Sequence, residues 1–113
     1  MTAPNIWRST TQDEAAASVL AGRSHLYGYS FVNDNAYAVY VKLYDALVGN
    51  VVVGTTIPKR VIPVPPYGYM LSESRGYPTT RFDNGLAVAI TKLRADSDAT
   101  AIDTGVFVEL FVV

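Results

Sequence analysis

Hydrophobic and polar residues alternate along short segments of this chain, and turn-forming residues separate the segments. Between positions 37 and 44 the odd-numbered residues are Tyr, Val, Val and Leu, and the even-numbered residues are Ala, Tyr, Lys and Tyr. Successive side chains of a β-strand point to opposite faces of a sheet, so this period of two predicts a strand whose valine face meets a core. The aromatic-rich residues 26–32 precede it and end at Asn33-Asp34-Asn35, a run typical of turns. We predict that the two segments form a hairpin.

The middle of the chain contains weaker strand signals. Residues 57–66 carry four prolines, and a proline lacks the N–H donor that the centre of a sheet requires. We therefore predict an edge strand there, or an extended segment that runs beside the sheet. Residues 67–72 fit a further short strand, and Val51-Val52-Val53 fits another within the connection that follows residue 44.

The last third of the chain predicts two strong strands. Turns are indicated at Gly76-Tyr77-Pro78 and at Asp83-Asn84-Gly85. Residues 86–93 then alternate large with small side chains, which places Leu86, Val88 and Ile90 toward the core. The valine-rich residues 106–113 form the last predicted strand.

Residues 9–22 fit two different structures. The polar run before the alanines and the glycine at position 22 fit a capped helix. The β-rich sequence that follows favours a strand or an extended arm, and we adopt that interpretation while leaving the helix open. The chain then divides into an N-terminal arm, residues 1–22, and a β-sandwich domain, residues 23–113.

Several short strands with turns between them predict an all-β fold, namely an antiparallel β-sandwich with an extended N-terminal arm. A jelly roll is one form that such a sandwich takes. The 113 residues are enough for one domain. A domain of this size buries roughly two-thirds of the surface of its unfolded chain, so it needs neither a metal nor a disulfide to hold its core. The chain contains no cysteine.

The charge composition limits the kinds of partner that we expect. The net charge is −1, only 17% of the residues are charged, and no basic run is present. Nucleic acid and membranes are therefore not expected as partners. No segment is long and apolar enough to span a membrane, and the first residues lack the pattern of a secretory signal, which favours synthesis in a cytoplasm. So few charges leave less polar surface, and we expect other protein to cover part of the exterior.

The side chains that could carry chemistry are few. His25 is the one histidine, and no nucleophile motif accompanies it. Asp96, Asp98 and Asp103 share a polar loop, but that loop lacks the glycine and the final glutamate of an EF-hand, so we expect the aspartates to cap their own backbone and to bind no calcium tightly. We predict no enzyme activity, no catalytic residue, no cofactor and no metal site.

The aromatic residues are the more informative feature. Aromatic side chains make up 12% of the chain, and such residues are enriched in protein interfaces. In two segments of similar pattern, residues 39–44 and 106–111, the aromatics alternate with the valine face and share a face with Lys42 and Glu109. We therefore place them on an outer face that a partner covers. The predicted interface residues are Ile6, Trp7, Tyr40, Tyr44, Phe107 and Phe111.

The two similar segments allow two explanations. They are neighbouring strands, in which case Lys42 and Glu109 pair across them, or they are alike because both solve the same packing problem. Ile6 and Trp7 stand in an otherwise polar stretch, and we expect residues 1–10 to dock on a neighbouring subunit or partner.

Residues 20–113 resemble small structural proteins of tailed bacteriophages in the order of their segments and in the kinds of residue that each segment contains. The segments that carry the resemblance are Leu26-Tyr27-Gly28-Tyr29, Asn33-Asp34-Asn35, residues 38–44, Ile62-Pro63-Val64-Pro65-Pro66, residues 84–89, Asp96-Ser97-Asp98 and the final valine-rich strand. The resemblance implies a β-sandwich virion component, such as a capsid cement or decoration protein, and it brings no functional residues with it.

We accordingly expect a virion structural protein, made in the host cytoplasm, that stabilises a capsid shell through protein–protein contacts. Its expected partners are further copies of itself, for example in a trimer, and the major capsid protein or another virion protein. A tail, neck or fibre component is the first alternative. A carbohydrate-binding β-sandwich module that uses exposed tyrosines is the second.

Overall fold

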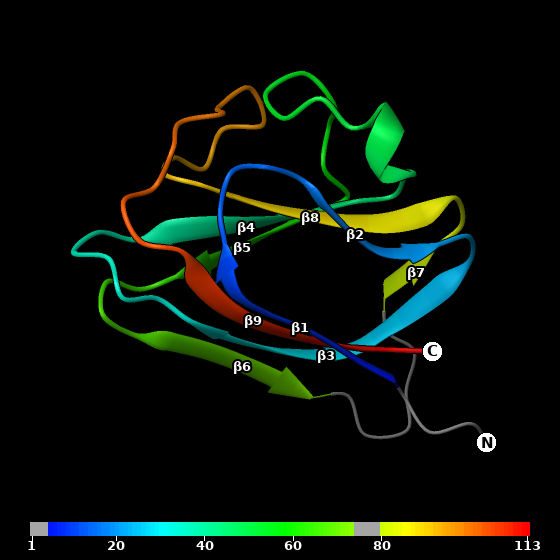
Figure 1. Cartoon of the computed structure of the whole chain (residues 1–113), viewed down its shortest axis with the longest axis horizontal. Helices are drawn as coiled ribbons and strands as arrows, with labels where there is room; N and C mark the ends of the chain where they lie inside the picture. Colours follow the sequence, from blue (N-terminus) through cyan, green and yellow to red (C-terminus); the bar gives the residue numbers. More distant parts are fainter. Residues whose placement is uncertain (1–4, 74–79) are drawn as a thin grey trace.

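The computed structural model describes residues 5–73 and 80–113, which form two antiparallel sheets packed face to face (Figure 1). The predicted all-β sandwich is confirmed. Sheet A has the order β1 (Asn5–Gln12), β9 (Val106–Val112), β3 (Ser24–Val32), β6 (Tyr69–Glu73), with β7 (Thr80–Phe82) also paired to β3. Sheet B has the order β2 (Ala17–Ala21), β8 (Gly85–Thr91), β4 (Val39–Tyr44), β5 (Arg60–Val64). A 3₁₀ turn, η1 (Val48–Asn50), is the one helical element of the described residues.

The strand pairs are nested along the chain. The innermost pair is β4 with β5, and around it lie β3 with β6, β2 with β8 and β1 with β9. Successive pairs alternate between the two sheets, and the pairings of β3 with β9 and of β4 with β8 complete each sheet. The same strand order would result if one long two-stranded antiparallel ribbon folded back on itself into two layers.

The core lies between the inner faces of the two sheets. On β9 every second residue is buried, and on β4 the valine and leucine positions 39, 41 and 43 are completely inaccessible to solvent. The predicted inward orientation of Leu86, Val88 and Ile90 on β8 is confirmed, because all three belong to the same buried cluster. Each fully buried aliphatic side chain contributes roughly 1.5–3 kcal/mol relative to an exposed one.

The predicted hairpin of residues 26–32 with residues 36–44 is wrong. β3 lies in sheet A and β4 lies in sheet B, so residues 33–38 cross from one sheet to the other. The buried amide of Asn33 explains why this turn crosses: its Nδ2 donates to the carbonyl oxygens of Tyr37 at 2.9 Å and Pro65 at 3.0 Å, while its Oδ1 accepts from the backbone N–H of Asn35. These hydrogen bonds hold residues 33–38, which connect the two sheets, against the β5–β6 connection.

Other sequence expectations are settled by the sheet order. The proline-rich segment provides β5 at an edge of sheet B, and residues 69–73 provide β6, as predicted. Val51-Val52-Val53 forms no strand; it lies in a turn-rich connection. The predicted turn at residues 76–78 lies outside the described residues.

The N-terminal stretch is extended, which decides against the helix. Its two strands pair within the domain: β1 is an edge strand of sheet A and β2 is an edge strand of sheet B. The stretch that we separated as an arm is therefore, from residue 5 onward, part of the sandwich.

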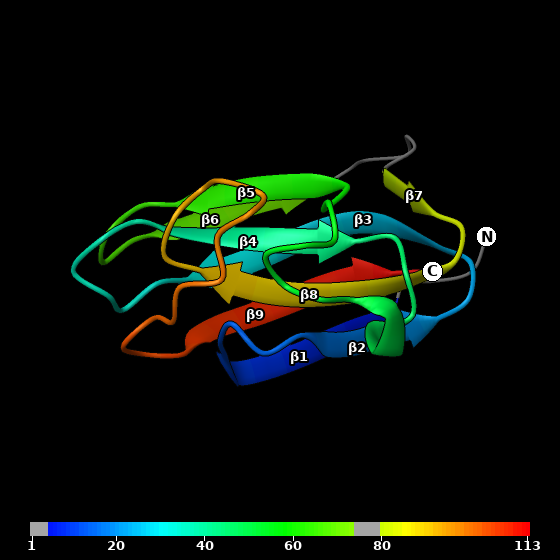
Figure 2. The ribbon, with the colours of Figure 1, turned by 90° about the horizontal axis from the view of Figure 1, so that it is seen from above.

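The outer faces of the two sheets differ. Residues 45–59 and residues 92–105 fold back over the outer face of sheet B, which Figure 1 shows above β4 and β8 and Figure 2 shows from the front. Beneath them Lys42 and Tyr44 are fully buried. Within the described residues no segment covers the outer face of sheet A in the same way. No helix in this part of the chain has the length and hydrophobicity needed to cross a membrane.

Candidate protein interface

The outer face of sheet A presents three rows of side chains that run across the strands. The pairing registers align Ile6, Phe111 and Gly28 in the first row. They align Arg8, Glu109, Ser30 and Leu71 in the second row, and Phe107, Val32 and Tyr69 in the third. We call these residues the uncovered face. Because β-strand side chains alternate, none of them points into the core.

The uncovered face is largely apolar and open to solvent. Tyr69 is 72% exposed, Leu71 63%, Ile6 62% and Val32 38%. The two phenylalanines are half-buried by their neighbours. In the register, Phe107, Val32 and Tyr69 are direct neighbours across β9, β3 and β6, and Leu71 lies two residues from Tyr69, so these three strands present adjoining apolar side chains. Arg8, Glu109 and Ser30 separate them from Ile6 and Phe111.

The charged residues of this face lie among the apolar ones. The guanidinium carbon of Arg8 lies 5.1 Å from the centroid of the Phe107 ring, a distance at which a cation–π interaction forms. Arg8 also lies opposite Glu109 in the strand register. The face thus combines apolar area with one charge of each sign, which a partner of matching charge would recognise in a single orientation.

Three of the sequence-predicted interface residues lie on the uncovered face: Phe107, Phe111 and Ile6. Trp7, the neighbour of Ile6, points to the opposite side and packs against the core of its own chain. Sequence reasoning missed Val32, Tyr69 and Leu71. The signal that finds them is the strand register, because it shows which alternate residues of β3 and β6 follow Phe107 and Glu109 across the sheet.

Tyr40 and Tyr44 lie on the other side of the molecule, on the outer face of sheet B. Tyr40 is half-exposed, whereas Tyr44 is completely buried against Ala87 and Ala89, with Val51 and Val53 packed alongside. The explanation that the two similar segments are neighbouring strands is wrong. Because β4 and β9 are in different sheets, Lys42 and Glu109 do not pair.

Lys42 is instead bonded to the loop that covers it. Its Nζ donates to the carbonyl oxygens of Ala95 at 2.6 Å and Asp98 at 2.9 Å. Burial lowers the pKa of Lys42, and the negative charges of Asp98 and Asp96 oppose that shift. Burial likewise raises the pKa of Tyr44, and the charge of Asp96 adds to the rise. The Tyr44 hydroxyl is buried without a hydrogen-bond partner among the described residues.

The acidic loop is held by hydrogen bonds within itself. Asp98 accepts from the backbone N–H of Leu93 at 2.9 Å and from the hydroxyl of Thr100. Partial burial would raise the pKa of Asp98, but these bonds and the charge of Lys42 outweigh it, so the pKa is lowered. In the described part of the chain no three His, Asp or Glu side chains gather in a metal-binding arrangement. His25 lies in β3, where its backbone pairs with that of Val113.

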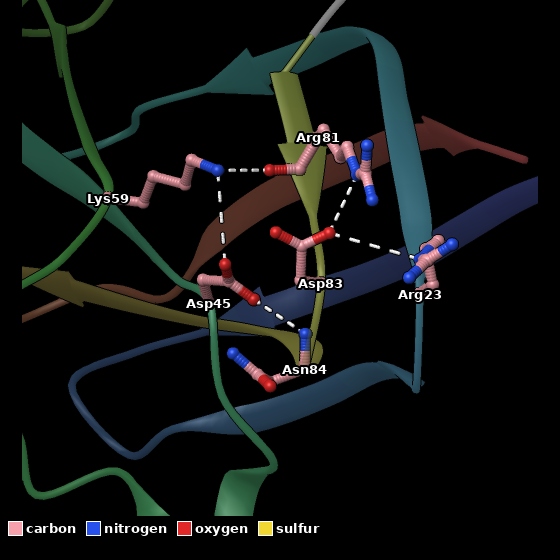
Figure 3. Close-up of polar contacts among 6 residues, drawn as sticks. All are labelled: Arg23, Asp45, Lys59, Arg81, Asp83 and Asn84. Atoms are coloured by element: carbon pink, nitrogen blue, oxygen red, sulfur yellow. Dashed lines mark hydrogen bonds and ion pairs between the residues drawn. The ribbon is translucent and has the colours of Figure 1, made fainter.

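A second polar cluster lies where β7 approaches the connection before β5 (Figure 3). Asp45 accepts from the backbone N–H of Asn84 at 2.8 Å and lies 3.9 Å from the Lys59 ammonium, which also donates to the carbonyl of Arg81. Asp83 forms an ion pair with Arg81 at 2.6 Å. These contacts connect β7, which pairs with sheet A, to the β4–β5 connection of sheet B.

Comparison with known proteins adds no relative. No family model matches the chain, and no curated protein or solved structure matches it.

Proposed function

We propose that this protein is a structural component of a virus particle and that its uncovered face binds a larger protein surface of that particle. The observation that carries the proposal is the exposure of large apolar side chains on the outer face of sheet A, where Tyr69, Leu71 and Ile6 are each more than 60% exposed. Exposure of such an apolar face to water costs free energy, and a partner that covers the face removes this cost.

The size of the face suits a protein partner. An aromatic side chain buries on the order of 150–250 Å², and a typical specific interface buries about 800 Å² on each side. Tyr69, Leu71 and Ile6, each more than 60% exposed, contribute most of the apolar area that a partner could cover on this face. The strand framework also holds the face rigid, so that little conformational entropy is lost on binding.

The strand order supports a virion role. The nested strand pairs, which alternate between the five-stranded and the four-stranded sheet, favour a jelly roll. Jelly rolls occur in viral capsid domains and in lectins. A fold does not determine a function, and the resemblance of residues 20–113 to structural proteins of tailed bacteriophages favours the virion.

Within the particle we propose the role of a capsid cement or decoration protein, with the major capsid protein or another virion protein as partner. Each bound copy adds contacts across neighbouring shell subunits and so stabilises the assembled state. A tail, neck or fibre component would use the same face, and the symmetry of the particle sites that the protein occupies distinguishes the two.

A carbohydrate-binding module is the second candidate, favoured by Tyr67 and Tyr69. Both are more than 70% exposed, and they flank Gly68 at the start of β6. Exposed aromatic rings stack on the apolar faces of sugars, and lectins share the jelly-roll architecture. Binding of the isolated protein to a glycan array, lost in Tyr67→Ala, would favour this function over the virion role.

The virion proposal is tested by rebinding the protein to particles from its native source that have been stripped of it. We expect the double variant Tyr69→Ser, Leu71→Ser to bind at least about tenfold more weakly, because both side chains belong to the interface. Tyr40→Ser, on the opposite face of the molecule, serves as the matched control and should bind like the unchanged protein. Equal binding of all three proteins, each shown to be folded by its thermal transition, would refute the proposal.

A further inference from the structure

Within the described residues, the main strand order of each sheet ends in two edge strands, and three of these four carry features that hinder pairing with a further strand. The register of β1 is irregular between Ser9 and Gln12, and that of β2 is irregular between Ser18 and Leu20. β5 contains Pro63, which lacks a backbone N–H. Bulges and prolines are among the means by which natural proteins protect the edges of their sheets.

The edge strand β6 has none of these features. Its five residues pair with β3 in an unbroken register, and no described strand lies on its other side (Figure 1). It contains no proline, and its one charged residue, Glu73, is the last of the strand. β7 also pairs with β3, but it does so further along that strand, opposite residues 24–26. β6 is therefore the edge strand best suited to accept a further strand.

The hydrogen-bonding pattern shows which backbone groups of β6 face the open side. The N–H of Asn33 donates to the carbonyl oxygen of Gly68 at 2.8 Å, so Gly68 directs its carbonyl toward β3. Successive residues of an antiparallel strand direct their backbone groups alternately toward and away from one neighbour. In the unbroken register that follows, Met70 faces β3, whereas Tyr69 and Leu71 direct their N–H and C=O groups to the open side. An added strand would supply hydrogen-bond partners for these groups.

From this edge we infer that two copies of the protein pair through β6, antiparallel and related by a two-fold axis at Leu71. In this register the N–H of each Leu71 donates to the carbonyl oxygen of the other, and Tyr69 pairs with Glu73 of the second copy. The backbone groups that β6 directs outward then all have a partner. The contact uses the same surface of both copies, so it closes at a dimer.

A second copy is the occupant that the chain itself supplies. It brings a free strand of equal length, without proline, whose outward backbone groups match those of the first copy. The side chain of Leu71 is 63% exposed, and in the paired register the two Leu71 side chains meet across the two strands and shield each other from water. Both project from the same side of the sheet, so the two uncovered faces become adjacent parts of one continuous surface.

The size of the contact determines how tightly the copies hold. A contact made chiefly by one strand from each copy is smaller than a standard interface of about 800 Å² per partner, so we expect a reversible dimer. The dimer presents two uncovered faces on one side of a single sheet. If the first face binds a particle, the second binds at a raised effective concentration. Binding by the joined faces rests on the proposed function, whereas the pairing of β6 does not.

Proline at position 71 tests the pairing. Leu71→Pro removes the N–H at the two-fold axis, and its matched control Leu71→Ser also removes the leucine side chain but keeps the N–H. Because this N–H does not bond to β3, both variants should keep the fold, which their thermal transitions check. Sedimentation of the unchanged protein should show a monomer–dimer equilibrium. Leu71→Pro should dimerise at least about tenfold more weakly than Leu71→Ser, since one hydrogen bond from each copy is lost.

Disulfide cross-linking tests the register, because the chain has no cysteine of its own. The Cα atoms of a hydrogen-bonded antiparallel pair are about 5.5 Å apart, a separation that a disulfide spans. Leu71→Cys should therefore form a covalent dimer under mild oxidation. Tyr69→Cys is the matched control on the same face. The two copies of position 69 would lie roughly 14 Å apart along the strands, so that variant should not cross-link.

Three results would overturn the inference: an unchanged protein that stays monomeric, a folded Leu71→Pro that dimerises like Leu71→Ser, or a Tyr69→Cys that cross-links as fast as Leu71→Cys. The third result would show that copies meet through their uncovered faces and not through their edges. If Leu71→Pro does not fold, the comparison of the two cysteine variants decides.

Failure of the proposed function gives a different result. It is measured as binding to stripped particles, whereas the disulfide yield is measured on the protein alone. Binding of the unchanged protein to particles without cross-linking of Leu71→Cys would refute the β6 dimer and leave the virion role standing. Cross-linking without binding to particles would do the reverse.

Discussion

The ammonium nitrogen of Lys42 lies 2.9 Å from the carbonyl oxygen of Asp98, a residue 56 positions further along the chain. Lys42 points outward from β4, yet it is completely buried, because the β8–β9 connection folds across it and supplies two carbonyl acceptors. A buried cation is costly without such partners. The lysine and the loop therefore depend on each other: the loop shields the charge, and the charge holds the loop.

Replacing this lysine should release the loop. We expect Lys42→Met to lower the free energy of unfolding by about 1–3 kcal/mol, since hydrogen bonds to a charged donor are lost and only part of the burial cost is recovered. Amide hydrogen exchange in residues 92–103 should become faster. Arg94→Met, an exposed cation of the same loop, is the matched control and should change neither quantity. If the free energy of unfolding of Lys42→Met equals or exceeds that of the unchanged protein, burial of the charge costs at least as much free energy as its hydrogen bonds contribute.

The carboxylate of Asp98 makes this loop sensitive to acid. Its pKa is lowered in the folded state, so the folded protein binds this proton less readily than the unfolded chain does. The stabilisation from Asp98 is therefore present above its ordinary pKa of 3.8 and is lost as the pH falls through the lowered folded-state value. Urea unfolding should show Asp98→Asn less stable than the unchanged protein at pH 6, with the difference shrinking below pH 3.8. A difference that is independent of pH would contradict this assignment.

Removal of the Tyr44 hydroxyl should not lower the stability of the protein. The hydroxyl is buried and has no partner among the described residues, and an unpaired buried hydroxyl costs roughly 1–3 kcal/mol. Tyr44→Phe should leave the free energy of unfolding unchanged or raise it by up to about 1 kcal/mol. Tyr37→Phe is the control, because the Tyr37 hydroxyl accepts from the backbone N–H of Asp103 at 2.8 Å and its loss should lower stability by about 1 kcal/mol. Thermal unfolding of Tyr44→Phe and Tyr37→Phe measures both changes in stability.

Neighbouring residues of β6 should separate stability from binding. Met70 points inward and packs against the core, whereas Leu71 points outward and is 63% exposed. We expect Met70→Ser to cost about 2–4 kcal/mol of unfolding free energy and Leu71→Ser to cost about 0.5 kcal/mol or less. The measurement is chemical denaturation of both variants. A large loss in Leu71→Ser would place that side chain in the core of its own chain and remove it from the uncovered face.

The fold class was predictable because alternation is a local signal. Val39 and Val41 show their orientation within a few residues, and Pro63 marks an edge strand wherever it occurs, since it has no N–H to donate. The pairing of strands was not predictable in the same way. Asn33 stands in a run typical of a hairpin turn, but its buried amide bonds to Pro65, and no local pattern records a contact with residues that far along the chain.

The candidate interface was predictable only in part for a related reason. Phe107 and Phe111 alternate with a valine face, so their outward direction followed from the sequence. Whether an outward residue is covered depends on what folds over it. Tyr44 has the same alternation as Phe111, yet the β4–β5 connection buries it. Tyr69 and Leu71 joined the face through their register with β3, which only the assembled sheet defines.

The position of β9 between β1 and β3 has a consequence for how the chain reaches this structure. Asn5 pairs with Val112, so the first strand of sheet A finds its neighbour only when the far end of the chain arrives. Closing so long a loop is entropically costly, and folds dominated by distant pairings form slowly. Sheet B, with the adjacent pair β4 and β5 at its edge, has an earlier nucleus available. Until β9 docks, the strand position between β1 and β3 is vacant. In a concentrated solution the β9 of another molecule can occupy it, and we therefore expect strand exchange between copies during refolding.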